Sequence, residues 1–238
     1  MGPDSAIHTF VDLLRRRATA TPDRRAYTFL PDGEGTGETR TCADVWAHAG
    51  GVARALAGLP PGTRVAVIVD EGHAFHAALY GCMLARVLAV PLHPPDPARP
   101  DRTLPRIVQV CAHAEVKLLL SQGPHPARLA EAWPGPSPQL VDVDRLGPDA
   151  TFEPEDVTPS DIAYLQYTSG STALPRGVRV SHRNLLHQLA NFDHGYDHGA
   201  DSVMVSWLPA THDLGLVYGR MMPWFRGFEG VFMPPAAF

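Results

Sequence analysis

A run of hydroxyl-bearing and small residues in the second half of the chain has the composition of a binding site for a polyanion. Small residues let backbone N–H groups approach an anion, and hydroxyl groups add hydrogen-bond donors with little bulk. A guanidinium at the end of the run can bind two phosphate oxygens in a bidentate fork. We therefore predict a cradle for nucleotide phosphates, formed by Thr168, Ser169, Gly170, Ser171, Thr172, Arg176 and Gly177.

This composition also fits a surface loop that binds no ligand, because short motifs of this kind arise by chance. The sequence lacks the GxxxxGK[ST] spacing of a P-loop, and it lacks the GxSxG of a hydrolase nucleophile elbow. On the residues alone, a phosphate cradle and an unliganded loop remain competing interpretations.

The elements that must position this loop alternate between strands and helices. Continuous apolar strands that alternate with helices indicate a parallel sheet with both faces covered. We therefore predict an α/β fold with a mostly parallel sheet flanked by helices. A first subdomain is expected in residues 1–158 and the start of a second in residues 159–238. The expected strands are 26–30, 64–69, 87–92, 116–120, 139–143, 162–167 and 203–209, and the expected helices include 74–84, 104–114 and 127–133.

Capping residues predict where three helices begin. A capping box is a pair of residues three apart in which each side chain accepts a hydrogen bond from the backbone amide of the other. This spacing occurs at Thr9 and Asp12 and again at Thr41 and Asp44. Ser181 is expected to cap a further helix directly after the phosphate loop.

Composition excludes several classes of partner. The formal net charge is -5 and 19% of the residues are charged, which argues against a nucleic-acid partner. The three cysteines lack metal-ligand spacing and favour a reducing, cytoplasmic location. No apolar run is long enough to span a membrane.

Three other groups of polar residues are expected to lie in solvent. His73 and His76 fit the exposed face of an amphipathic helix, and residues 15–17, three consecutive arginines, fit a solvated helix end. His194 and His198, each next to an aspartate, could suggest a metal, but their glycine-rich surroundings favour a solvated loop. We predict no metal site formed by protein ligands.

The phosphate loop, read together with residues 165–167, resembles the signature of adenylate-forming enzymes and is most similar to that of the fatty acyl-AMP ligases. Ala173 stands where that family usually has glycine, and Arg176 where it usually has lysine. Downstream, residues 207–209 (Trp-Leu-Pro) lead into His212, Asp213, Leu214 and Gly215, which resemble the His-Asp-Met-Gly of the family. Further similarity at residues 29–34, 80–83, 89–95 and 104–107 extends over essentially the whole chain.

This resemblance implies the N-terminal portion of the large domain of an adenylate-forming enzyme. The implied reaction activates a fatty acid with ATP and Mg²⁺ to an acyl-adenylate, with release of pyrophosphate. The acyl group would pass to the phosphopantetheine of an acyl carrier protein, serving a polyketide or peptide assembly line. The resemblance places His212 near the reacting carboxylate, with residues 212–215 beside the acyl chain. On the residues alone, His212 and Asp213 could merely cap a helix.

The family would continue past residue 238 with its adenine- and ribose-binding segments and a mobile domain that carries a lysine. We therefore expect an incomplete active site that needs a C-terminal half in cis or in trans. Two alternatives stay open: a fragment of an acyl-CoA synthetase, which uses coenzyme A as the acceptor, and a non-catalytic module that acts through a partner.

Overall fold

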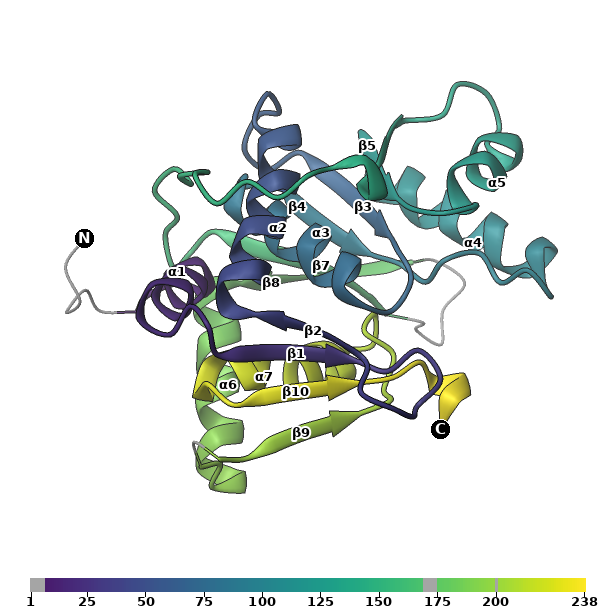
Figure 1. Cartoon of the computed structure of the whole chain (residues 1–238). Helices are drawn as coiled ribbons and strands as arrows, with labels where there is room; N and C mark the ends of the chain where they lie inside the picture. Colours follow the sequence, from purple (N-terminus) through teal and green to yellow (C-terminus); the bar gives the residue numbers. More distant parts are fainter. Residues whose placement is uncertain (1–6, 169–174, 200) are drawn as a thin grey trace.

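The computed structural model describes residues 7–168, 175–199 and 201–238, which form two β-sheets with helices packed between and around them (Figure 1). The larger sheet has the strand order β6-β5-β3-β4-β7-β8, and all its neighbours are parallel except the β7–β8 hairpin. Its strands, in that order, are Gln139–Asp142, Leu118–Ser121, Arg64–Ile68, Leu88–Pro91, Ile162–Thr168 and Arg176–Ser181.

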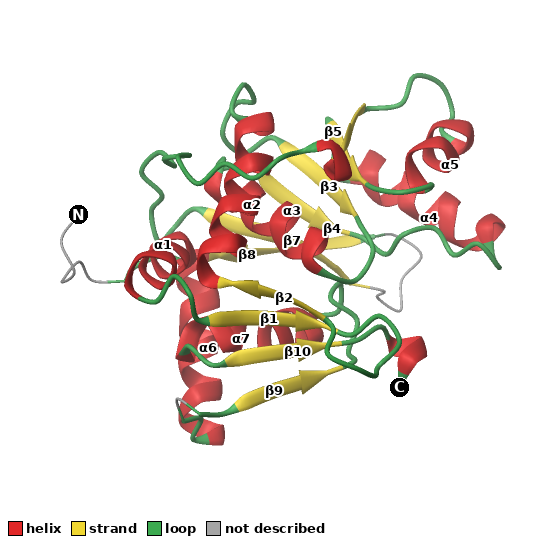
Figure 2. Cartoon of the chain, in the orientation of Figure 1, coloured by secondary structure: helices red, strands yellow, loops and turns green. Residues whose placement is uncertain are grey.

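The smaller sheet has the order β2-β1-β10-β9, in which β1 and β2 are antiparallel and the other neighbours are parallel. Its strands are Glu38–Thr41, Arg25–Phe29, Glu229–Phe232 and Val203–Ser206. Figure 2 shows this sheet below the larger one, with helices behind it. The sheet joins segments from the two ends of the chain, and sequence reasoning predicted only β1 and β9 among its strands.

The helices cover both faces of the larger sheet, as predicted. Val65 and Val67 of β3 belong to one apolar cluster with residues of α2 and α3, whereas Ala66 and Ile68 belong to another with residues of α4. This alternation follows from the strand period of two. The helices are α1 (Phe10–Ala20), α2 (Cys42–Leu56), α3 (His73–Leu84), α4 (Pro100–His113), α5 (His125–Ala132), α6 (His182–Tyr196) and α7 (Met222–Arg226). A π-helix, η2, spans Leu214–Met221, and the 3₁₀ turns η1 and η3 span Val143–Arg145 and Pro235–Ala237.

The predicted helix starts are confirmed. The Asp12 amide donates to Thr9 Oγ1 at 3.0 Å, and the Thr9 amide donates back to the Asp12 carboxylate at 2.8 Å. Thr41 and Asp44 form the same reciprocal pair at the start of α2. Ser181 caps α6 by accepting from the amide three residues later. These contacts are local, so the sequence spacing is enough to specify them.

Each sheet takes strands from both sides of residue 158, so the two sheets do not correspond to the two predicted subdomains. Sheet membership does not define a subdomain, and the boundary at residue 158 stays a prediction. Among the helices that the structure describes, none is long and apolar enough to cross a membrane.

The expectation of a solvated α3 face is wrong for His76. Its side chain is 2% exposed, and its ring stacks on Tyr27 at a centroid distance of 4.0 Å. The reason is the smaller sheet, since β1 covers the helix face that a single-sheet fold would leave open. His73 is partly buried and its Nε2 lies 2.7 Å from the Glu38 carbonyl oxygen.

Arg17 is also not simply solvated. Its Nε and Nη2 donate to the carbonyl oxygens of Trp224 and Phe225 at 3.0 and 2.9 Å. These carbonyls belong to α7, which is more than 200 residues away along the chain, so a helix-end pattern could not reveal the contact. Neighbouring Arg16 is exposed, as expected.

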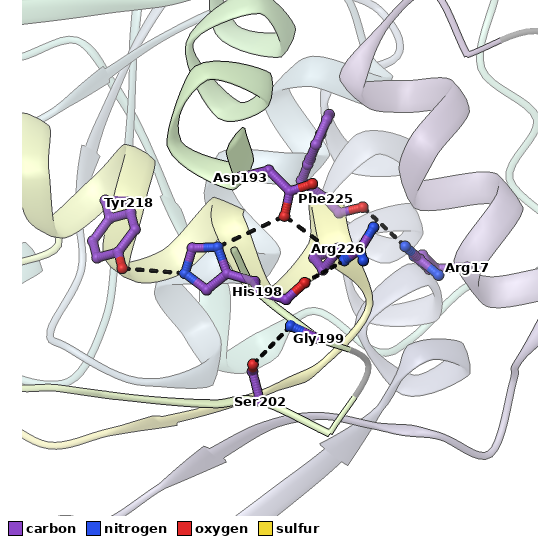
Figure 3. A network of polar contacts seen from close by, with 8 residues as sticks. All are labelled: Arg17, Asp193, His198, Gly199, Ser202, Tyr218, Phe225 and Arg226. Carbon is purple, nitrogen blue, oxygen red and sulfur yellow. Dashed lines mark hydrogen bonds and ion pairs between the residues drawn. The ribbon is translucent and has the colours of Figure 1, made fainter. Parts of the chain in front are cut away.

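The histidine segment after residue 192 is helical rather than a loop as far as Tyr196, because α6 extends through Asp193 and His194. Beyond the helix, the His198 side chain is only 9% exposed. Figure 3 shows its ring between Asp193 and Tyr218, with Nε2 at 3.2 Å from the tyrosine hydroxyl. Arg226 Nε donates to the His198 carbonyl oxygen at 2.7 Å. The histidine therefore joins α6, η2 and α7 instead of lying in solvent.

Buried His182 makes the stability of this fold sensitive to acid. Its Nδ1 accepts from the Phe10 amide at 3.3 Å, and burial lowers its pKa to about 4. In the unfolded chain this histidine binds a proton near pH 6.5. The contribution of the neutral, buried His182 to the free energy of unfolding is therefore complete above pH 6.5 and is lost as the pH falls toward 4. Between pH 7.5 and 5 the loss is about 2 kcal/mol.

His182→Asn, whose carbonyl oxygen can still accept from Phe10, is expected to remove about 2 kcal/mol of this pH dependence. Urea unfolding at the two pH values measures the difference. The same change at exposed His113 should leave the pH dependence in place. An equal pH dependence in His182→Asn and the wild type would contradict the assignment.

Candidate active site

The two ends of the predicted phosphate loop meet across the β7–β8 hairpin. Thr168 pairs directly with Arg176, and Tyr167 pairs with Gly177. An antiparallel pair holds such partners about 5 Å apart at Cα, so the hydroxyl and the guanidinium leave the hairpin at the same end. The other predicted members, Ser169, Gly170, Ser171 and Thr172, lie outside the described residues.

Arg176 is exposed, and it pairs with none of the acidic side chains in the described ranges. A fixed cation that has no acidic partner in the described part of the chain, beside a threonine hydroxyl, suits phosphate oxygens, so these residues fit the phosphates of ATP. Gly177 lies under the Tyr167 ring, and a Cβ there would come within 2.9 Å of it. The absence of a side chain at Gly177 therefore allows the Tyr167 ring to lie across the neighbouring strand, next to the Thr168–Arg176 pair.

The second predicted site is a turn that leads into the π-helix η2. The His212 side chain is 66% exposed, and its Nδ1 lies 2.7 Å from Asp213 Oδ1. The same carboxylate oxygen accepts from the Leu214 amide at 2.7 Å, so Asp213 caps the helix. A proton on Nδ1 directed at this carboxylate leaves Nε2 of His212 available to other partners. A short π-helical segment of this kind is frequent at functional sites.

Gly215 makes this turn possible. A Cβ at Gly215 would lie 2.2 Å from the Pro209 carbonyl oxygen, so any larger residue would push the turn open. Neighbouring Leu214 has 46% of its surface exposed, while Gly215 itself is buried. The four residues predicted to bind substrate are therefore adjacent, but they differ in how accessible they are.

Polar residues at the carboxyl ends of two strands tie the His212 turn to the larger sheet. Gln166 of β7 donates from Nε2 to the Thr211 carbonyl oxygen at 2.8 Å. His93, which follows β4, places its Nε2 2.6 Å from Thr211 Oγ1. Because Gln166 is two residues before Thr168, β7 links the two predicted sites directly.

Sequence reasoning took Gln166 as part of the phosphate signature and His93 as scaffold. The signal that could have found them is their position, because ligands of parallel sheets bind beyond the carboxyl ends of the strands. Burial lowers the pKa of His93, and the nearby charges of Arg106 and His212 lower it further.

A cavity of about 450 Å³ lies beside this turn, between Thr211 and His93 on one side and α5 on the other. His125 forms part of its wall, with Nε2 2.9 Å from Asp70 Oδ1. The volume lies in the range of small-molecule sites. Within the described residues, no three histidine, cysteine or acidic side chains are arranged to hold a metal ion.

The AMP-binding enzyme family matches residues 14–238. The chain belongs to this family. Its relatives include the medium-chain-fatty-acid–[acyl-carrier-protein] ligase JamA of Moorena producens, which is 32% identical over 238 residues. They also include the long-chain-fatty-acid–AMP ligase FadD26 of Mycobacterium marinum, which is 35% identical over 240 residues. The matches cover 97% and 95% of this chain but only 40% and 41% of those two proteins.

Solved structures of AMP-binding enzymes agree with this fold. The fatty acyl-adenylate ligase from L. pneumophila, determined with acyl adenylate and pyrophosphate, matches with a TM-score of 0.86 at 29% sequence identity. The match covers 95% of this chain and 40% of that one. The mixed α/β architecture predicted from the sequence is therefore confirmed as that of adenylate-forming enzymes.

Proposed function

We propose that this chain binds the reacting phosphate and carboxylate groups in an enzyme that activates a fatty acid to its acyl-adenylate. The observation that carries the proposal is the hydrogen bond from Gln166 to the Thr211 carbonyl oxygen at 2.8 Å. Through it, one strand holds both the Thr168–Arg176 end of the hairpin and the turn that bears His212. A phosphate-binding and a carboxylate-binding group at the end of one strand are what an adenylate-forming site requires.

In the reaction, a carboxylate oxygen of the fatty acid forms a bond to the α-phosphorus, and the bond to the pyrophosphate leaving group breaks. ATP supplies the phosphorus centre and that leaving group when it is bound. Arg176 would offset the charge that develops on the phosphate oxygens, with the Thr168 hydroxyl as a further donor. His212 would orient the carboxylate through Nε2 while Asp213 holds the ring. Mg²⁺ would contact mainly phosphate and water.

The acceptor that we propose is the phosphopantetheine thiol of an acyl carrier protein, in the cytoplasm. The name of the Moorena relative, an acyl-carrier-protein ligase, supports this acceptor over coenzyme A. Because the chain spans about 40% of its curated relatives, we expect further residues of the complete site to come from a C-terminal half.

Arg176→Ala is expected to lower fatty-acid-dependent ATP–pyrophosphate exchange by about 100-fold, the typical effect of removing one donor to a developing oxyanion. Arg176→Lys should keep more of the rate, since it retains the charge but loses the bidentate fork. Arg179→Ala on the same strand is the matched control, because it removes an exposed arginine three residues farther from the loop.

The exchange is measured on the chain itself and on a form extended by the C-terminal half of a relative. Exchange that requires the extension would support the proposal and the expected division of the site. If both forms fold and neither exchanges, or if Arg176→Ala and Arg179→Ala have equal effects, the proposal fails. A non-catalytic module would then be the better interpretation.

A further inference from the structure

Glu71 reaches from the end of β3 to the backbone of the His212 turn. Its Oε1 accepts from the Ala210 amide at 2.7 Å, and its Oε2 accepts from Nη2 of Arg220. Ala210 is buried and lies two residues before His212. Together with His93 and Gln166, this carboxylate gives the turn a hydrogen-bonded contact from the end of each of three strands, β3, β4 and β7.

Arg220 is fully buried and has few ways to move. Its guanidinium carbon lies 4.1 Å from the centroid of the Phe232 ring on β10. Its carbonyl oxygen accepts from the Tyr27 hydroxyl of β1 at 2.7 Å. Among the described residues, its Nε and Nη1 have no hydrogen-bond partner, and its one carboxylate contact is Glu71. Arg220 therefore directs its charge at a single carboxylate.

A contribution to stability does not by itself explain the Glu71–Arg220 ion pair. Burial raises the pKa of Glu71 although Arg220 opposes the rise, and burial lowers the pKa of Arg220 although Glu71 opposes the fall. Burial thus works against both charges while their attraction works for them, and the desolvation of a buried ion pair commonly offsets much of that attraction. The pair instead orients a side chain: Arg220 holds Glu71 so that one carboxylate oxygen of Glu71 points at the Ala210 amide.

We propose that Glu71 is a positioning residue for the acyl-adenylate-forming reaction: aimed by Arg220, its carboxylate fixes the Ala210 amide and so sets where the turn presents His212. This inference rests on the proposed function. Glu71 need not touch the substrate, since it acts through the backbone of the turn. A displacement of about 1 Å at a reacting group can cost as much as 100-fold in rate, so a loosened turn should lower kcat.

The test uses Glu71→Gln, which keeps the shape of the side chain but removes its charge. Glu229→Gln is the matched control, because Glu229 is also part-buried and accepts a hydrogen bond, from Thr28 Oγ1 at 2.6 Å, but lies on the smaller sheet. Glu71→Gln is expected to speed hydrogen exchange of the Ala210 amide at least about 10-fold, and to lower kcat for pyrophosphate exchange by about 10-fold. The KM for ATP should stay unchanged, because Thr168 and Arg176 lie on the hairpin. Glu229→Gln should change none of these.

Glu71→Gln leaves a buried guanidinium uncompensated and could fold poorly, so Glu71→Gln with Arg220→Met is the second variant. A purely structural pair predicts that this double variant regains kcat together with stability. A positioning role predicts that it regains stability while kcat stays low and the Ala210 amide stays fast to exchange. Recovery of kcat, or unchanged protection of Ala210 in both variants, would overturn the inference.

The two proposals fail in different ways. If the wild type shows no pyrophosphate exchange even with the extension, the proposed function fails. The positioning of the turn is then decided by Ala210 hydrogen exchange and by the ring resonances of His212, which should shift in Glu71→Gln and not in Glu229→Gln. If the wild type is active and Glu71→Gln matches it in kcat, only the positioning inference fails.

Discussion

Arg220→Met is expected to lower the free energy of unfolding by about 3–5 kcal/mol, the usual cost of breaking a buried ion pair from one side. Methionine fills much of the same space, but it leaves the Glu71 carboxylate, whose side chain is 17% exposed, without its cation. The contact of the guanidinium with the Phe232 ring is lost as well. Urea unfolding at pH 7.5 measures the change.

Arg54→Met is the matched control for this substitution. Arg54 also has a carboxylate partner, Asp149 at 2.9 Å, and an aromatic ring, Phe152, with its centroid at 5.1 Å. Its side chain is 59% exposed, however, so water can replace what the substitution removes. A much smaller loss is expected there. Equal losses at Arg220 and Arg54, or no recovery of stability when Glu71→Gln is added to Arg220→Met, would contradict the account of a buried pair.

Gly51→Ala is expected to destabilise the protein by about 2–3 kcal/mol, at the upper end of what overpacking a core costs. A Cβ at Gly51 in α2 would lie 1.9 Å from the Gly147 carbonyl oxygen. The segment that approaches the helix is held in place, because the Asp149 amide donates to the Ala47 carbonyl oxygen at 2.8 Å. Alanine gains about 1 kcal/mol over glycine within a helix, but the backbone shift that is needed should exceed this gain.

Gly58→Ala tests whether the loss at Gly51 comes from the close approach. Gly58 lies just beyond α2, and a Cβ there would meet no heavy atom within 4 Å. Its replacement should change the free energy of unfolding by no more than about 0.5 kcal/mol. Thermal or urea unfolding of the two variants side by side measures the contrast, and a neutral Gly51→Ala would show that residues 147–149 can move away from the helix at little cost.

Both large effects depend on contacts that no local pattern reveals. Glu71 and Arg220 are 149 residues apart, and Gly51 and Gly147 are nearly 100 apart. In the sequence, Arg220 is one arginine among apolar residues, and Gly51 is a glycine in a helical pattern. Their importance comes from what the fold places opposite them.

The sequence by itself determined the features whose causes are local. The capping boxes at Thr9 and Thr41 need only residues three apart, and the apolar strands of the larger sheet show their burial in an unbroken run of side chains. Composition marked residues 168–177 as a candidate phosphate loop, and the hairpin places Thr168 opposite Arg176. Four of its predicted residues, 169–172, lie outside the described ranges, so their role stays a prediction.

Only the tertiary structure decided how the rest is assembled. The pairing of β1 with β10 joins segments about 200 residues apart, and it buries His76, which an amphipathic pattern had assigned to solvent. The same assembly brings Glu71, His93 and Gln166 to the turn that carries His212. The physical reason is that such contacts depend on which surfaces meet, and periodicity records that a face is buried but not what covers it.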